Sequence, residues 1–179
     1  MANSKRKGNA GEREVSKWWQ QWTTYEFSRV PSSGGLRWHS THNTVGDIMC
    51  THEIHSRRFQ FAIECKNYKD INFEHLILGN KSVKVLDFWK QTSEDAERGS
   101  RIPILFMRYN GMPKNMYFVV VSRNLFSVMA QYTKDELENN YFIVPKEDFV
   151  IMNSADLLNI NYITLHKQLK KLRKDGQKF

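Results

Sequence analysis

The apolar residues near the start of the chain recur with helical spacing. Apolar side chains at positions i, i+3, i+4 and i+7 predict one buried helix face, in a helix that follows the segment 8–11. The residues on this face are Val15, Trp18, Trp19 and Trp22. The same reasoning predicts a second long helix over residues 82–98, ended by Gly99. Weaker patterns predict a short helix over residues 125–132 and a basic helix over residues 165–174.

Runs of apolar and β-branched residues between the helices predict strands. They cover residues 25–30, 47–51, 57–66, 102–109 and 115–122, with a further extended piece at 141–144. This order predicts an α/β fold, with a central mixed five-stranded sheet flanked by helices and extra C-terminal elements. At 179 residues we expect a single domain over residues 1–179, with a core at about 8–122 and a C-terminal elaboration at 123–179.

The strand over residues 57–66 ends in a carboxylate, a thiol and an ammonium, Glu64-Cys65-Lys66. Successive side chains of a strand point to opposite faces, so Glu64 and Lys66 share one face and Cys65 lies on the other. For the tripeptide alone, an exposed ion pair is as good an interpretation as a metal site. A metal-dependent phosphodiesterase has a reason for the pattern, because it places a hard oxygen ligand and a cation near one phosphate.

The charge of the chain favours a polyanionic partner, of which nucleic acid is the commonest. The net charge is +8 and the isoelectric point is near 9.5. Cys50 and Cys65 lie in apolar segments, and we expect them to be reduced thiols. No apolar run has the length of about 18 residues that a membrane span needs, and the basic N-terminus is not a signal peptide. We therefore expect a cytoplasmic protein, in the host cytoplasm if a phage encodes it.

Asp47 supplies a second carboxylate, at the start of the strand over residues 47–51. If this strand is a neighbour of the strand over 57–66, Asp47 and Glu64 meet at one sheet edge, where the backbone carbonyl of Cys65 adds another oxygen. Water and phosphate oxygens would complete the octahedral shell of Mg²⁺, for which Mn²⁺ would substitute. Lys66 would orient or activate the attacking water, or stabilise the charge on the phosphate. No phosphate-binding loop of the Walker type is present, so we expect no nucleotide cofactor.

Three further polar residues lie in short motifs but are ambiguous singly. Glu12 follows Asn9 at the spacing of a helix capping box, which is one interpretation, and membership of the acidic cluster is the other. Arg13 and Arg29 each fit a surface role that only aids solubility.

Taken in order, four motifs resemble those of the archaeal-type Holliday junction resolvases, which belong to the PD-(D/E)XK nuclease superfamily. The motifs lie at residues 7–14 (KGNAGERE), 28–34 (SRVPSSG), 46–48 (GDI) and 63–66 (IECK). The resemblance covers about residues 5–122. It implies a restriction-endonuclease-like core and Mg²⁺-dependent cleavage of four-way DNA junctions. Two symmetric cuts need two active sites, which implies a homodimer.

The resemblance also assigns roles to individual residues. It implies that three carboxylates organise the metal, that one lysine serves catalysis, and that two arginines contact the substrate phosphate or shape the site. These residues are Glu12, Asp47 and Glu64, then Lys66, then Arg13 and Arg29. A serine near the DNA would be Ser32 or Ser33, and the sequence leaves both open.

Basic and aromatic residues around this core are expected to contact DNA. Trp38 is suited to stack on bases, and the basic helix over 165–174 is suited to salt-sensitive, non-specific binding. The candidates outside that helix are Lys5, Arg6, Lys7, Ser32, Ser33, Arg37, Trp38, Lys81 and Lys84. His39 and His42 have the spacing of metal ligands, but no further ligands lie near them in the sequence, so a metal site is disfavoured. His39, with Arg37 and Trp38, is expected either to line the DNA path or to make an ordinary loop contact.

Two alternative functions stay open. Residues 36–45 look like an insertion relative to the resolvases, which would suit a restriction-like or recombination-associated endonuclease acting on other branched or linear DNA. A non-catalytic DNA-binding module on a nuclease fold is the alternative from another class.

Overall fold

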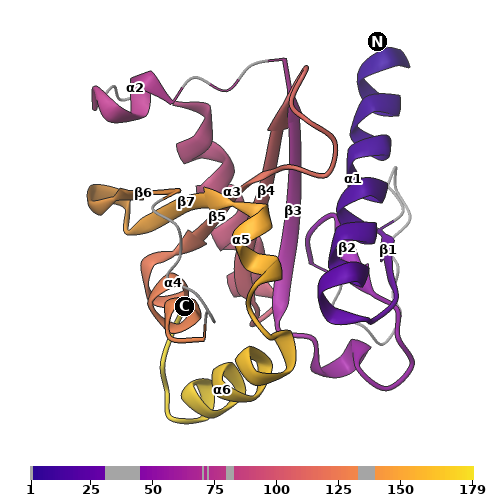
Figure 1. The fold of residues 1–179 in the computed structure, drawn as a ribbon, viewed down its shortest axis with the longest axis vertical. Helices are drawn as coiled ribbons and strands as arrows, with labels where there is room; N and C mark the ends of the chain where they lie inside the picture. The colour runs from indigo at the N-terminus through magenta and orange to yellow at the C-terminus, as the bar shows by residue number, and fades with distance from the viewer. Residues whose placement is uncertain (1, 31–44, 70, 72, 80–82, 133–139) are drawn as a thin grey trace.

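The computed structural model describes residues 2–30, 45–69, 71, 73–79, 83–132 and 140–179 (Figure 1). The helices are α1 (Ala2–Thr23), α2 (Glu74–Ile77), α3 (Lys84–Arg98), α4 (Arg123–Ala130), α5 (Ser154–Leu158) and α6 (Tyr162–Lys174), with 3₁₀ turns η1 (Ser56–Arg58) and η2 (Pro145–Glu147). The strands are β1 (Phe27–Arg29), β2 (Ile48–Cys50), β3 (Phe61–Tyr68), β4 (Ile102–Tyr109), β5 (Phe118–Ser122), β6 (Tyr141–Val144) and β7 (Phe149–Asn153).

The strands form one mixed sheet in the order β1-β2-β3-β4-β5-β7-β6. β3 and β4 run parallel and are joined through α3, whereas the other neighbouring strands pair antiparallel. The α/β class is as predicted, but the sheet has seven strands, so the prediction of five is wrong. The extra strands β6 and β7 form a hairpin on β5. β7 is a run of only five residues, and periodicity alone does not distinguish such a run from a buried helix segment.

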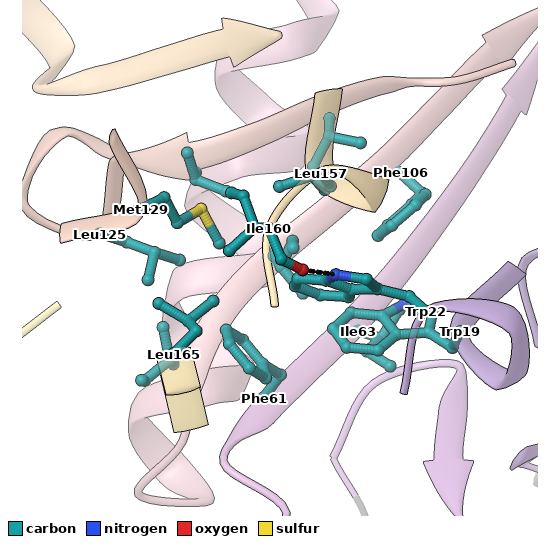
Figure 2. Close-up of a cluster of buried hydrophobic side chains, with 14 of the residues drawn as sticks. Trp19, Trp22, Phe61, Ile63, Phe106, Leu125, Met129, Leu157, Ile160 and Leu165 are labelled. Carbon is teal, nitrogen blue, oxygen red and sulfur yellow. Dashed lines mark hydrogen bonds between the residues drawn. The ribbon is translucent and has the colours of Figure 1, made fainter. Parts of the chain in front are cut away.

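One face of the sheet carries an aromatic core. The tryptophans of α1 pack there with the side chains of β3 and β4 and with α4, α5 and α6 (Figure 2). Trp19 is fully buried, and its ring lies 5.4 Å from the ring of Phe61. The indole N–H of Trp22 donates to the carbonyl of Ile160 at 2.9 Å, which joins α1 to the segment before α6. The predicted apolar face of α1 is therefore confirmed.

The start of α1 differs from the prediction. The helix begins at Ala2 and runs through Gly8 and Gly11, which we expected to precede it. Gly11 is buried, and a Cβ built there would lie 3.4 Å from Nδ2 of Asn67 on β3. The glycine lets the helix approach the strand closely, and this packing offsets the cost of about 1 kcal/mol that glycine adds to a helix interior.

The opposite face is covered by α3. Val83 and Val85 pack with Leu105 and Met107 of β4 and with Val120 of β5. The predicted helix ends as expected, with Gly99 at its C-terminus. No helix in the described part of the chain is long and apolar enough to cross a membrane.

The C-terminal region has more regular structure than the sequence predicts. α4 and α6 occupy the two regions in which helices are predicted, and β6 has the expected bounds. The missed elements are short: α2, α5 and β7. Each contains only four or five residues, too few for a periodic pattern to be recognised.

Candidate active site

Asp47 is held at the point where β2 meets β3. Its backbone N–H donates to the carbonyl of Ile63 at 2.7 Å, and its carbonyl accepts from the N–H of Val30 at 2.8 Å. Its side-chain oxygen Oδ2 accepts from the backbone N–H of Cys65 at 2.9 Å. The carboxylate is thus fixed beside the end of the strand that carries Glu64, as the sequence predicts.

Gly46 makes this approach possible. Its φ is +83°, in the left-handed region that favours glycine, and a Cβ built there would collide with the backbone of Ile63. The resemblance was to a superfamily named for a proline at the position before the metal-binding aspartate. Here the position needs a residue without a side chain, because β2 and β3 come together directly beneath it.

Glu64 and Lys66 lie on the α3 face of β3. Nζ of Lys66 donates to Oε1 of Glu64 at 2.7 Å and to Oε1 of Gln91, on α3, at 3.2 Å. The ammonium also lies 5.6 Å from the centre of the Phe88 ring. The side chain of Glu64 is 7% exposed and that of Lys66 is 19% exposed. The pair is therefore not the exposed ion pair that was the simpler interpretation.

Glu12 lies on α1 and is paired with Arg29 of β1. Nε of Arg29 lies 2.7 Å from Oε2 of Glu12, and its Nη2 donates to Oδ1 of Asn9 at 2.8 Å. The capping-box interpretation is wrong, because α1 begins at Ala2 and Asn9 accepts from Arg29 instead of capping the helix. The two predicted residues therefore meet, and they join α1 to the sheet next to the acidic cluster.

The charges of this cluster influence one another. Burial, followed by the negative charge of Glu64 and then that of Glu12, raises the pKa of Asp47 to about 7, although the N–H of Cys65 and the charge of Lys66 oppose the rise. Burial disfavours the charged form of Lys66, but the hydrogen bond that it donates to Glu64 and the charges of Glu64 and Asp47 outweigh this and raise the pKa of the lysine. Lys66 is therefore a cation at neutral pH. Its charge and the N–H of Cys65 do not fully offset the effect of burial and of the neighbouring carboxylates on the pKa of Asp47.

The donor set fits a hard divalent cation. Mg²⁺ is bound in proteins by one or two carboxylates, and it keeps several waters or phosphate oxygens. Asp47 and Glu64 would supply the two carboxylates, and burial and the charge of Glu64, which raise the pKa of Asp47, are conditions that a bound cation would relieve. Within the described residues, no three His, Cys, Asp or Glu side chains are grouped as metal ligands. This agrees with Glu12 being engaged by Arg29.

The Cys65 thiol lies on the α1 face of β3, opposite to Glu64 and Lys66. Burial, with the nearby carboxylates, raises its pKa well above the ordinary value, so it stays protonated. A protonated thiol is a poor ligand, which leaves the backbone carbonyl of Cys65 as the group predicted to bind the metal.

The other predicted residues are more peripheral. Arg13 is exposed on α1, one position after Glu12. Lys84 is exposed at the start of α3, with Nζ 4.9 Å from the centre of the Tyr68 ring. Lys5, Arg6 and Lys7 lie in the first turns of α1, but their side chains are outside the described part of the structure. The remaining predicted residues, Ser32, Ser33, Arg37, Trp38, His39, His42 and Lys81, also lie outside the described residues.

Two contacts of the site, made by Gln91 and Asn9, could not be inferred from the sequence. Gln91 is an ordinary polar residue on the exposed side of α3, and only the packing of α3 on β3 brings it to Lys66. Asn9 is in a recognised motif, but its bond to Arg29 joins residues 20 positions apart and cannot be inferred from local spacing.

Two comparisons with known proteins bear on the family of this chain. Residues 3–173 match the model of the family described as "Phage putative PDDEXK endonuclease". The chain is also similar to Protein D14 of Escherichia phage T5, with 29% identity over 106 residues, which is 59% of this chain and 64% of that protein. The match thus spans less than two thirds of the phage T5 protein. Since the family model covers nearly the whole chain, this protein belongs to the phage PD-(D/E)XK endonuclease family.

Proposed function

We propose that this protein is a Mg²⁺-dependent endonuclease that resolves four-way DNA junctions by paired, symmetric phosphodiester hydrolysis. The observation that carries the proposal is the convergence of Asp47, Glu64 and Lys66 where β2 meets β3. Membership of an endonuclease family supports cleavage of DNA. The order of the four motifs, which resembles that of the junction resolvases, supports the branched substrate.

In this mechanism, Asp47, Glu64 and the Cys65 carbonyl would hold Mg²⁺, and Glu12, which is paired with Arg29, would help to organise it. The metal would supply positive charge to the phosphate and lower the pKa of the attacking water. Water attacks phosphorus, the bond to the 3′ oxygen breaks, and the products are a 5′-phosphate and a 3′-hydroxyl.

Lys66 acts as a cation in this scheme, because its pKa is raised. It donates to a non-bridging phosphate oxygen or orients the water, and it stabilises the negative charge that develops at phosphorus. Arg29, and Arg13 on the turn of α1 that carries Glu12, would contact the substrate phosphate or shape the site. A junction has two equivalent strands to cut, so we propose that the protein acts as a homodimer.

The test is cleavage of a synthetic four-way junction and of a linear duplex with the same arm sequences. We expect the parent protein to nick the junction in pairs placed symmetrically across the branch point, with Mg²⁺ or Mn²⁺ and not with EDTA. Asp47→Asn should reduce cleavage by about a thousandfold or more, because it removes a ligand charge. Asp175→Asn, an exposed aspartate at the end of α6, is the matched control and should cleave normally.

Other results would favour the other candidates. Equal cutting of junction and linear duplex, or preferred cutting of flaps and forks, would replace the resolvase with a restriction-like or recombination-associated nuclease. Tight DNA binding without cleavage in either metal, and with Asp47→Asn unchanged, would indicate a non-catalytic DNA-binding module.

A further inference from the structure

An aromatic concavity lies at the far end of the sheet from β1. It has a volume of about 620 Å³ and is lined by side chains of β4 to β7 and the turn before β5, with no charged residue in its lining. Its wall includes Tyr109, Phe118, Tyr141 and Phe142. Tyr109, Tyr141 and Phe142 are 38%, 37% and 41% exposed, although large apolar side chains of this kind are normally covered. Several exposed aromatic faces around one hollow indicate a binding surface.

The strand register connects this concavity to the candidate active site. Tyr68 on β3 pairs with Tyr109 on β4, and Lys66 lies two residues before Tyr68. With about 3.3 Å per residue and about 4.8 Å between strands, the backbones of Lys66 and Tyr109 lie about 8–9 Å apart. Residues paired across strands and those two apart along a strand share a face. Tyr109 therefore lies on the same face as Lys66.

A second row of residues reaches the far wall. Glu64 pairs with Leu105, and the row continues through Val120 and Ile151 to Phe142 on β6. Phe142 is therefore on the same face of the sheet as Glu64. Their backbones are separated by four strand spacings, or about 19 Å at the usual distance between strands. α3 covers the buried middle of this row, so a ligand would follow the ends of β3 and β4 to reach the concavity.

The path between the two places carries positive charge. Lys69 is exposed directly after Tyr68, Lys84 lies over the Tyr68 ring, and Lys114 is exposed beside the lining residue Pro113. Arg108 is on the opposite face of β4, where Glu14 of α1 meets its charge at 2.6 Å. Cations along the rim and neutral aromatic rings in the hollow match the two parts of a nucleotide, the phosphate and the base.

We propose that this aromatic concavity binds unpaired nucleobases of the DNA strand that is cut at Lys66. The inference rests on the proposed function, because it places the cleaved phosphate beside Lys66. At about 3.4 Å per nucleotide in a stacked strand, the near wall lies about two or three nucleotides from that phosphate. Bases at a branch point, which can leave the duplex, are the class of ligand recognised. A second copy of the chain is disfavoured as the occupant, because its own lysines would meet the same lysines on this rim.

The experiment measures DNA binding with Ca²⁺ in place of Mg²⁺, by fluorescence anisotropy. One probe is a forked DNA with unpaired bases at the branch, and the other is a fully paired duplex of the same length. Phe142→Ala and Tyr109→Ala should each weaken binding of the fork about tenfold and leave duplex binding unchanged, because base stacking on one ring is lost. Phe142→Trp should bind the fork as the parent does. Ile163→Ala, on α6 and with a side chain 53% exposed, is the control for loss of an exposed apolar group.

A second readout reports on the bases themselves. 2-Aminopurine placed in the unpaired part of the fork should be quenched by the parent protein and not by Phe142→Ala, provided that both have the same melting temperature. Equal loss of fork and duplex binding, or no loss, would overturn the inference. So would a fall in molecular mass of Phe142→Ala on sedimentation, which would make the hollow a contact between copies. If the parent cleaves no DNA the proposed function fails, whereas a cleaving parent with unchanged fork binding by the variants overturns this inference alone.

Discussion

The two faces of β3 differ in what they contribute to the protein. On the α1 face, Phe61 and Ile63 are fully buried among the tryptophans of α1, and apolar contacts dominate. On the α3 face, the same strand presents Glu64 and Lys66, with Asp47 beside them. The first face buries large apolar area, which is the main stabilising term in folding. The second holds carboxylates close together, and burial, together with the charge of Glu64, raises the pKa of Asp47.

The residues that stabilise the fold and the residues proposed for catalysis therefore lie on opposite faces of the same strand. Mutually repelling carboxylates destabilise a metal-free fold, and such strain is typical of functional sites. The aromatic core on the other face of the strand compensates for it. Substitutions in the aromatic core of the α1 face should therefore reduce stability, whereas Asp47→Asn and Gln91→Ala on the α3 face should reduce activity and leave stability equal or higher.

The largest change in stability is expected from Trp19→Ala, on the α1 face. The side chain is fully buried, and removing a buried aromatic group leaves a cavity, which should lower the free energy of unfolding by about 3–5 kcal/mol. The measurement is urea unfolding followed by tryptophan fluorescence and circular dichroism. Trp89→Ala, on the half-buried side of α3, is the control and should lose less. A loss of under about 1 kcal/mol for Trp19→Ala would show that this face does not dominate stability.

The next largest change is a gain in stability, on the α3 face. Asp47→Asn should raise the free energy of unfolding of the metal-free protein by about 2 kcal/mol at about pH 8, because the folded protein binds a proton at Asp47 more tightly than the unfolded chain does. The cost of keeping Asp47 charged in the folded protein is complete above about pH 7, which is the pKa of Asp47 there. It disappears at a pH low enough to protonate the carboxyl in the folded and the unfolded protein alike. The difference between variant and parent should therefore shrink as the pH falls toward about 4.

The measurement is urea unfolding in EDTA across this pH range, repeated with Mg²⁺. With Mg²⁺ the parent should gain stability and the variant should not, since a ligand that binds only the folded state stabilises it. A variant that is less stable than the parent in EDTA at high pH would contradict the assignment of electrostatic strain to this face.

The same comparison explains what the sequence could predict. The α1 face follows from helical spacing, because Val15, Trp18, Trp19 and Trp22 are a local pattern. The acidic cluster follows from motif order, and the structure brings Asp47 to Glu64 as expected. Pairings between distant segments leave no such pattern, which is why the bond between Arg29 and Asn9 and the contact of Gln91 with Lys66 could not be predicted. The short strand β7 was beyond reach for a different reason, since five apolar residues fit helix and strand alike.

Gln91→Ala gives the smallest effect and separates positioning from stability most sharply. Gln91 accepts from Nζ of Lys66 while Glu64 accepts from the same atom, so an amide is one of two groups that fix the ammonium. If Glu64 binds a metal, the amide of Gln91 would remain as a neutral partner of Lys66. We expect kcat for junction cleavage to fall about tenfold, with KM and the free energy of unfolding unchanged, because the side chain is exposed and acts only through Lys66.

Two variants test whether this effect is specific. Lys90→Ala, whose side chain is 78% exposed on the same helix, should leave kcat unchanged. Gln91→Glu keeps an oxygen acceptor and should recover part of the lost rate, although its charge competes with the phosphate for Lys66. If Gln91→Ala lowers the melting temperature as much as it lowers kcat, the residue serves the packing of α3 and the separation of the two faces fails at this position. If kcat falls alone, the α3 face contributes a positioning residue whose loss leaves the fold intact.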